Sequence, residues 1–450
     1  MKVLLVQPIS STGRGLPAPP FGLMYMTAMV EREGFEVKIL DRNIETDTIK
    51  EMKKFSPDIL GVSCLTGPMI LDGLIVTKKA KDLFGNAITT IWGGIHPSLL
   101  PEQTLMNRYI DIVVIGEGEH TFLELLTALK EKKKLKDVKG IGYKKNGRII
   151  LNEKRPLIKN LDELPELAWN RVKAKKYLRY ETPLLTSRGC PHRCAFCYNQ
   201  KFNERKWRGM SAERVLREIE YLESIHPIKR LKFYDDNLTA DRKRFFAIIE
   251  GIPLDYPLFI ETRVDYINNE FINKIKKFSD PYLFIGVESG SPSMLKKMQK
   301  DITIPQIKYA FNLLNKNNIN TTASFMIGLP GETMEEVQMT LKLVDKINPT
   351  RYTCCIYTPY PGSLFYDEIV KENLVKLPQS LEEWGKFSSL ETASINVSKV
   401  DAEYLEKIYK NFWYMSIWKF IKRRRYNWLC VGIHNYLNIK YLTLLRYFRP

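Results

Sequence analysis

The chain has 450 residues and carries 69 Lys or Arg against 51 Asp or Glu, a formal net charge of +18, with 44% hydrophobic residues. This length predicts more than one domain, and the composition is that of a globular protein without the long uncharged apolar run that a membrane-spanning helix requires. The basic charge favours an acidic partner without naming one. Seven cysteines, an odd number, indicate a reducing compartment and argue against a disulfide framework, so we expect a cytoplasmic protein.

Apolar strands and helical patterns alternate from Lys2 to about Leu129. The strands are KVLLVQP, FEVKILD, DILGVSC, AITTIWGG and DIVVIGEGE. Strands separated by helices predict βαβ units, so residues 1–136 are expected to form an α/β domain with a Rossmann-like, doubly wound parallel sheet. Ligands of such sheets bind at the carboxyl ends of the strands, where this sequence is rich in Gly, Pro, Ser and Thr.

Residues 137–180 interrupt this pattern, with a hairpin predicted around Asn146 and Gly147 and then a linker. A second series of strands follows over residues 181–395: PLLTS, RLKFYDD, LFIETR, YLFIGVES, TTASFMIGLP and RYTCCIYTP, each with a helical pattern after it. Six parallel strands with helices outside predict a partial (β/α)6 barrel, whose chemistry belongs at the C-terminal strand ends. Residues 396–450 are expected to form a helical, basic C-terminal extension.

Three cysteines, Cys190, Cys194 and Cys197, lie within eight residues on the loop after the first strand of the second series. A zinc site usually takes four ligands from two separated pairs, and no second Cys or His pair with that spacing stands nearby. Three thiolates on a short loop instead suit three corners of an iron–sulfur cube, which leaves the fourth iron open to another ligand. A zinc-stabilised turn is the alternative.

The Cys-x3-Cys-x2-Cys spacing, with Phe196 directly before the third cysteine, resembles the radical S-adenosylmethionine (SAM) superfamily. The resemblance implies a [4Fe-4S] cluster on the three cysteines, whose open iron binds the amino and carboxylate groups of SAM. The reduced cluster then cleaves SAM to a 5'-deoxyadenosyl radical in a shielded site. It also implies that Phe196 contacts SAM, and it implies a low-potential electron donor such as ferredoxin or flavodoxin.

The later strand ends carry the residues that the resemblance assigns to SAM. Asp235 and Asp236 end the second strand, where a carboxylate suits the SAM ammonium, and Arg263 suits the carboxylate. Glu288, in GVESGS, resembles the ribose-contacting position. The fifth-strand motif FMIGLPGET places Ile327 and Gly328 along the adenine, with the glycine one place from the commonest pattern. For each residue the alternative is an ordinary strand-end charge or a helix cap.

A Rossmann-like domain before this barrel resembles the cobalamin (B12)-binding subclass, and the two regions together cover roughly residues 1–390. The resemblance rests on the loops GVSCLTGPM, WGGIHPS and VIGEGEHTFLELL, whose small residues let a flat corrin ring approach the strand ends. The cobalamin contacts expected from these loops are Ser63, Leu65, Thr66, Gly93, Gly94, His96, Gly116 and Glu117. No Asp-x-His-x-x-Gly motif occurs, so we expect no protein imidazole on cobalt, and we expect the Ser63 to Met69 loop to face its lower side.

Residues 401–450 hold 10 Lys or Arg against 3 Asp or Glu and interleave them with aromatic residues. A basic, aromatic helix suits a membrane surface, which would make the protein peripheral at the inner membrane face. A helical cap packed on the barrel is the favoured interpretation, and the two are compatible. No RNA-binding signature accompanies the basic stretch, so we expect no nucleic-acid partner.

These features predict a cobalamin-dependent radical SAM enzyme, with methylation of an unactivated carbon of a hydrophobic small molecule or lipid as the leading hypothesis. Ring formation or another radical rearrangement, on a tetrapyrrole or lipid, is the alternative. A tRNA methylthiotransferase would need three more cluster cysteines in the N-terminal region, which has only Cys64. A non-catalytic cobalamin carrier or sensor would not need the cysteine cluster.

Overall fold

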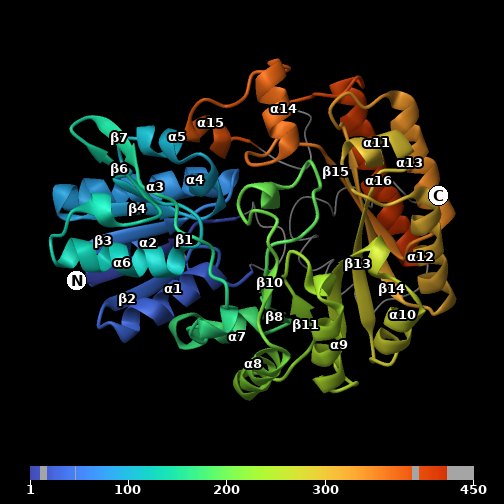
Figure 1. Cartoon of the computed structure of the whole chain (residues 1–450), viewed down its shortest axis with the longest axis horizontal. Helices are drawn as coiled ribbons and strands as arrows, with labels where there is room; N and C mark the ends of the chain where they lie inside the picture. Colours follow the sequence, from blue (N-terminus) through green and yellow to red (C-terminus); the bar gives the residue numbers. More distant parts are fainter. Residues whose placement is uncertain (11–17, 46, 388–394, 423–450) are drawn as a thin grey trace, which may run out of the picture.

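The computed structural model describes residues 1–10, 18–45, 47–387 and 395–422, without side-chain detail for residues 413 and 417–422 of the last helix. Two α/β units lie side by side along the longest axis of the molecule (Figure 1). Each unit is built around its own sheet, of seven strands in the first unit and six in the second. The expected fold class is therefore confirmed, and the two sheets provide the frame for the site.

The sheet of the first unit has the order β2-β1-β3-β4-β5-β6-β7, with parallel pairing as far as β5. Its strands are β1 (Lys2–Gln7), β2 (Glu36–Asp41), β3 (Ile59–Ser63), β4 (Thr89–Gly93), β5 (Ile112–Val114), β6 (Ile141–Lys145) and β7 (Arg148–Leu151). The hairpin expected around Asn146 and Gly147 is confirmed, because β6 and β7 pair on either side of it. This hairpin extends the first sheet as an antiparallel edge, since β6 also pairs with β5.

Helices cover both faces of this sheet, because its strands carry consecutive buried residues that point to both faces. The helices are α1 (Phe21–Arg32), α2 (Thr48–Phe55), α3 (Pro68–Phe84), α4 (Ile95–Leu99), α5 (Pro101–Met106) and α6 (Gly118–Lys130). On β1, Val3 and Leu5 join the core under α1 and α6, whereas Leu4 and Val6 join the core under α2 and α3. The carboxyl ends of the strands are left for loops, where a ligand can reach them.

The sheet of the second unit is entirely parallel, in the order β15-β14-β13-β12-β11-β8. Its strands are β8 (Thr182–Leu184), β11 (Leu231–Phe233), β12 (Leu258–Arg263), β13 (Pro281–Glu288), β14 (Asn320–Ile327) and β15 (Arg351–Ile356). Since β8 and β15 are both edge strands and do not pair with each other, the barrel is open, as expected for a partial (β/α)6 barrel. The strand order follows the chain, which brings all the strand-end loops to one rim.

The helices of the second unit lie mostly outside its sheet, and several begin at side-chain caps. They are α7 (Ala174–Tyr177), α8 (Ala212–Ile225), α9 (Arg242–Gly251), α10 (Asn269–Ile275), α11 (Pro292–Lys297), α12 (Ile304–Lys316), α13 (Met334–Ile347), α14 (Leu364–Glu372), α15 (Leu381–Gly385) and α16 (Ala402–Lys422). Thr303 and Thr333 form capping boxes with Gln306 and Glu336, which fix where α12 and α13 begin.

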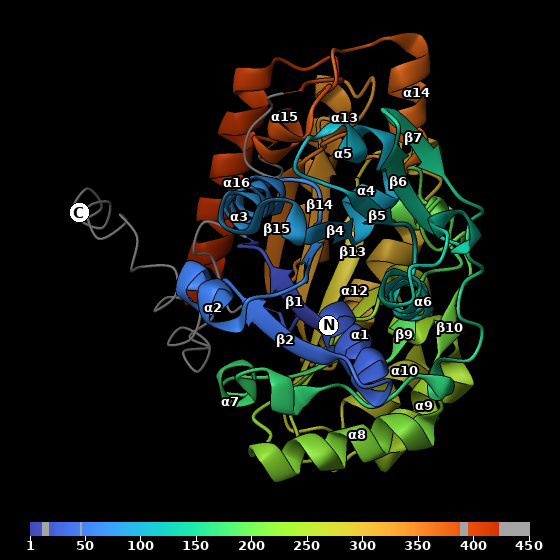
Figure 2. The ribbon, with the colours of Figure 1, turned by 90° about the vertical axis from the view of Figure 1, so that its left-hand side faces the viewer.

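The first part of the C-terminal extension is a cap on the barrel. Helix α16 lies alongside the edge strand β15, which is seen from the first unit in Figure 2. Phe412 contacts the rings of Tyr352 and Phe325 edge-on, and Leu405 and Ile408 are also buried. Residues 423–450, including the basic run expected at a membrane surface, lie outside the described residues. Across the described part of the chain, no helix is both long enough and apolar enough to cross a bilayer.

The two units touch through chain segments beyond their sheets. Helix α15 packs on α3, and Trp384 of α15 is fully buried, with its ring edge-on to His96 of the first unit. On the linker side, the hydroxyl of Tyr177 donates a hydrogen bond to Asp41 at the end of β2. With the units held in this arrangement, the carboxyl ends of strands from both sheets line one shared space between them.

Candidate active site

The loop that carries the three cysteines is held at its base by a short antiparallel ribbon. Strands β9 (Ser187–Arg188) and β10 (Arg208–Gly209) pair with each other, and the cysteine loop connects them. Gly189 adopts a φ of +81°, and a side chain there would collide with the carbonyl oxygen of Lys206, so only glycine fits. The ribbon therefore begins the cysteine loop at a fixed place on the barrel rim.

Two of the three thiol groups of this loop lie near a hydrogen-bond donor. Asn237 Nδ2 lies 3.5 Å from Cys190 Sγ, and Arg263 Nη1 lies 3.6 Å from Cys194 Sγ. Burial raises the pKa of Cys197 to about 12, so this thiol is neutral unless a metal ion or a cluster draws its proton away. Within the described residues, no three Cys, His, Asp or Glu side chains converge as a finished metal site. The three thiols and the donors near two of them suit an iron–sulfur cluster in composition, because donors to sulfur tune such clusters.

The two aspartates at the end of β11 point to different partners. Asp235 is buried and accepts hydrogen bonds from Thr186 and Ser187, and burial nevertheless raises its pKa. Asp236 accepts from the backbone N–H of Gly189 at 2.9 Å and from the hydroxyl of Tyr198 at 3.1 Å, and it lines the space between the units. Of the two expected SAM ligands, Asp236 is the one that faces a cavity, whereas Asp235 fixes the end of β8.

Glu288 and Arg263 are both engaged in the structure. Glu288, buried and with a left-handed φ of 69°, accepts a hydrogen bond from Lys300 Nζ at 2.7 Å. The same ammonium lies 5.8 Å from the centre of the Phe196 ring. Arg263 pairs with Asp265 and donates to the backbone oxygen of Lys300. A non-glycine residue in this backbone region is typical of functional sites, because the surrounding contacts must impose it.

The fifth-strand motif forms a buried turn. Ile327 is fully buried at the end of β14, and Gly328 follows with a φ of +77°. The backbone N–H groups of Gly328 and Leu329 both donate to Glu332, whose pKa burial raises to about 7. Leu405 of α16 approaches the open side of Gly328. The turn is thus closed over by the C-terminal helix.

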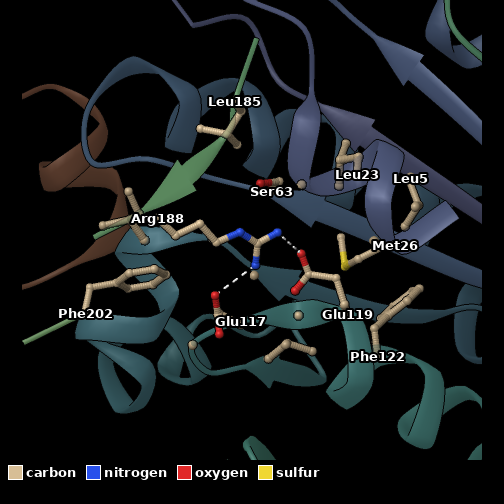
Figure 3. Close-up of a pocket in the computed structure, with 18 of the residues that line it drawn as sticks. Leu5, Leu23, Met26, Ser63, Glu117, Glu119, Phe122, Leu185, Arg188 and Phe202 are labelled. Atoms are coloured by element: carbon tan, nitrogen blue, oxygen red, sulfur yellow. Dashed lines mark hydrogen bonds and ion pairs between the residues drawn. The ribbon is translucent and has the colours of Figure 1, made fainter. Parts of the chain in front are cut away.

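A cavity of about 330 Å³ lies where the two rims meet (Figure 3). The first unit contributes Ser63, Gly93, Gly94, Gly116 and Glu117, five of the eight residues expected to contact cobalamin. The second unit contributes Ser187, Arg188, Tyr198 and Asp236 from the cysteine loop and its neighbours. The cavity therefore joins the strand ends of the first sheet to the loop that bears the cysteines.

Glycines leave the first-unit side of this cavity open. A Cβ atom added at Gly22 or Gly116 would meet nothing within 4 Å, so these positions face empty space. Gly94 has a φ of +94°, and its Cβ would lie 2.7 Å from the backbone oxygen of Cys64. Such a rim is suited to a large planar ligand that approaches the backbone closely, as the cobalamin assignment requires.

Three charged residues of the cavity lining, Arg188, Glu117 and Glu119, belong to one charge network (Figure 3). Arg188 donates to Glu117 at 2.9 Å and to Glu119 at 2.6 Å. Arg208, which lies opposite Arg188 in the β9–β10 ribbon, donates to the same Glu117 at 2.8 Å. The carboxylate of Glu117, an expected cobalamin contact, is thus engaged by two arginines whose charges would otherwise repel. The network ties the base of the cysteine loop to the end of β5.

The other three expected cobalamin residues lie outside the cavity lining. Leu65 is exposed, and the hydroxyl of Thr66 lies 3.0 Å from Nδ1 of His96. His96 is fully buried, and its Nε2 has no hydrogen-bond partner among the described residues. Burial lowers the pKa of His96 to about 4, so its ring is neutral at physiological pH.

Sequence reasoning missed several residues of this site, namely Arg188, Arg208, Lys300 and Tyr198. Arg188 precedes Cys190 by two positions, which is a usable signal once the loop is known. Lys300 lies twelve residues after Glu288, at the end of a helical stretch, and its sequence context resembles a solvated Lys-rich surface. Only the folded chain brings it to the barrel rim.

Comparison with known proteins agrees with both halves of the structure. The profile of the radical SAM superfamily matches residues 184–344, and that of the B12-binding domain matches residues 12–126. An uncharacterised methyltransferase of Pyrococcus horikoshii is 36% identical over an alignment of 406 positions, and the match covers 87% of each chain. An anaerobic magnesium-protoporphyrin IX monomethyl ester cyclase of Rubrivivax gelatinosus is 30% identical over 82% of this chain and 70% of its own.

A solved structure shares the arrangement of both units. It is a radical SAM methyltransferase from Kitasatospora setae with cobalamin and a [4Fe-4S] cluster bound, and it superimposes with a TM-score of 0.70 at 19% identity, over 86% of this chain and 81% of its own. At that identity the likeness shows the fold alone. The two domain matches and the 36% identical relative show that this chain belongs to the cobalamin-binding radical SAM enzymes, whose cofactors are a [4Fe-4S] cluster, S-adenosylmethionine and cobalamin.

Proposed function

We propose that the protein is a C-methyltransferase that acts on an unactivated carbon of a hydrophobic small molecule or lipid. The observation that carries this proposal is the cavity in which the glycine-lined rim of the first sheet meets the cysteine loop. When bound there, SAM on the cluster supplies a carbon-centred radical, and cobalamin supplies a transferable methyl group. Both must reach the same substrate carbon, and a shared cavity between the two units meets that requirement.

The residues of the chain then have distinct tasks. Cys190, Cys194 and Cys197 would hold the cluster, with Asn237 and Arg263 as donors to two of the sulfurs. Asp236 is the carboxylate available to the SAM ammonium, and Glu288 with Lys300 forms a charged pair at the same rim. The cobalamin domain would comprise residues 1–136, and the barrel residues 181–395, with residues 137–180 joining them.

The lining of the cavity supports a hydrophobic substrate. Its walls include Leu5, Leu23, Met26, Phe122, Leu185 and Phe202 (Figure 3). Arg188 in the lining and Arg208 next to it balance the charges of Glu117 and Glu119. Asp236 adds one further carboxylate to the lining. Apolar walls also exclude water, which a radical reaction requires.

The experiment uses anaerobically reconstituted protein with cobalamin, dithionite and SAM that carries a deuterated methyl group, incubated with metabolite extracts from a strain that lacks the protein. We expect 5'-deoxyadenosine and a product that has gained the deuterated methyl group, both read by mass spectrometry. Cyclisation is the second candidate, since a relative that is 30% identical is a cyclase. A product without the label but with 5'-deoxyadenosine would favour it, and absence of 5'-deoxyadenosine would overturn both.

We further propose that the protein works in the cytoplasm and receives electrons from a small low-potential carrier. Contact with the inner membrane face would come from the basic end of the C-terminal extension, whereas the described part of α16 supports a cap on the barrel. Liposome co-sedimentation of the full chain, compared with a variant in which Arg423, Arg424 and Arg425 are replaced by Ser, tests the membrane contact.

A further inference from the structure

A basic depression lies on the surface behind the cysteine loop. It has a volume of about 570 Å³ and is lined chiefly by Lys154, Arg155, Lys159, Lys206, Trp207 and Arg208. One wall comes from the segment after β7, and the other from the segment that connects the third cysteine to β10. The depression is therefore built on the same stretch of chain that presents the cysteines.

The depression and its surroundings are strongly positive. Residues 153–159 and 201–208 contain seven Lys or Arg and two Glu. Three of these basic residues and one Glu pair with residues outside the two segments, which leaves four basic residues against Glu204, an excess of three positive charges. Glu204 is shared by two ammonium groups, since Lys154 lies 2.5 Å and Lys206 lies 2.7 Å from its carboxylate. The Lys154 and Lys206 side chains are still 48% and 64% exposed, so their charge is presented to solvent. A positive surface of this kind attracts acidic partners over a distance.

A chain of contacts leads from this surface to the first cysteine. The indole N–H of Trp207, in the wall of the depression, donates to the backbone oxygen of Asn237 at 2.9 Å. The side-chain amide of Asn237 in turn lies 3.5 Å from Cys190 Sγ. Two residues thus connect the basic depression to a proposed ligand of the cluster.

We propose that the basic depression is the docking surface for a small, acidic, low-potential electron-carrier protein, which reduces the cluster through Trp207 and Asn237. One electron leaves the carrier and enters the cluster at each encounter, and no bond is made or broken. The proposal rests on the proposed function only in that the cluster must be reduced before SAM is cleaved. It gives the excess positive charge around the cysteine loop a specific partner.

The test compares two charge-reversal variants of the full reconstituted protein. The variant K154E/K159E/K206E changes the depression, and K173E/K175E/K176E changes a second basic surface around α7 as a matched control. Cluster reduction by flavodoxin hydroquinone, with reduced ferredoxin as a second donor, is followed by visible absorbance in a stopped-flow instrument. We expect the bimolecular rate constant for cluster reduction to fall at least about tenfold in the first variant and to change little in the control.

Dithionite separates the possible failures. This small reductant needs no docking surface, so it should reduce the wild type and both variants at the same rate. Equal rates with the carrier protein in all three proteins would overturn the proposal, as would an equal loss in the control variant. If dithionite leaves the wild-type cluster oxidised, the proposed function fails instead. If the flavodoxin rates are equal and a short oligonucleotide binds the wild type but not the K154E/K159E/K206E variant, the depression would be assigned to nucleic acid instead.

The contact chain has a test of its own. Trp207→Leu removes the indole that joins the depression to Asn237 while it leaves the lysines in place. At saturating flavodoxin we expect a slower electron transfer, with the dissociation constant of the carrier unchanged and with iron and sulfide content equal to the wild type. Transfer at the wild-type rate would exclude the route through Trp207, and a lost cluster is recognised by the iron content.

Discussion

The rims of the two sheets face one cavity but are constructed in opposite ways. On the first unit the strand ends are backbone and glycine, with Gly22 and Gly116 facing empty space. On the second unit the strand ends carry charged side chains that already have partners, such as Glu288 with Lys300 and Arg263 with Asp265. The first rim is thus shaped for a large ligand held by close approach, and the second for small polar groups held by fixed side chains. The contact between them is the Glu117 network.

The largest effect is expected on the second rim. Replacing Cys190 by Ala removes one of three proposed cluster ligands, and we expect cluster content and 5'-deoxyadenosine formation to fall to background while cobalamin binding is retained. Iron and sulfide analysis, the visible spectrum of bound cobalamin and product assays measure the three quantities. Cys355→Ala, on β15, is the control and should keep its cluster. Loss of cobalamin together with the cluster would contradict the independence of the two rims.

The next largest effect is expected from removing the Glu117 carboxylate, which joins the two rims. Glu117→Gln removes the carboxylate that two arginines share, whose side chains are only 15% and 9% exposed, and an uncompensated buried charge costs about 3–5 kcal/mol. We expect the free energy of unfolding to fall by about 3 kcal/mol, measured by urea denaturation. The more exposed pair of Arg155 with Glu124 gives the control, and Glu124→Gln should cost less than about 1 kcal/mol.

The stabilisation that the Glu117 carboxylate provides depends on pH. Burial acts to raise the pKa of Glu117, but Arg188 and Arg208 outweigh it and hold the pKa below its ordinary value of 4.5. The stabilisation from the network is therefore complete above pH 4.5 and is lost as the pH falls below that value. In Glu117→Gln this loss should be absent.

The sequence predicts the local features of the two rims, but it does not predict the charge pairs between residues that are far apart in the chain. The strand series, the cysteine loop and the glycines are local features, because a strand pattern, a ligand spacing and a positive φ each depend on neighbouring residues. Glu117 was expected to contact cobalamin, but its partners Arg188 and Arg208 lie 71 and 91 positions away in the chain. Likewise Lys300 meets Glu288 and Phe196 only after the barrel closes. Pairings of charged groups across units depend on tertiary structure, and a sequence pattern does not specify them.

Protonation of His96, on the first rim, should lower the stability of the protein in a higher pH range than protonation of Glu117 does. Because burial lowers the pKa of His96 from 6.5 to about 4, the folded state favours the neutral ring, and its contribution is complete above pH 6.5 and lost as the pH falls toward 4. By pH 5 the wild type should lose about 2 kcal/mol of stability relative to His96→Gln, which does not titrate. Urea denaturation at pH 7 and pH 5 measures the difference. A constant difference between the two proteins would show that His96 is solvated.

A filled first rim should weaken cobalamin binding without unfolding the protein. Gly22 lies in the first turn of α1, has no neighbour within 4 Å of its Cβ position and lines the cavity, so Gly22→Leu projects its side chain into the proposed corrin space. We expect cobalamin affinity to fall about tenfold, or about 1.4 kcal/mol, in titrations followed by visible absorbance. Gly22→Ala is the matched control, because it replaces a helical glycine, gains up to about 1 kcal/mol of stability and adds only one carbon to the cavity. Should both variants bind cobalamin as tightly as the wild type, the glycine rim would not be the corrin surface, and the contrast between the two rims would have to be explained by the substrate alone.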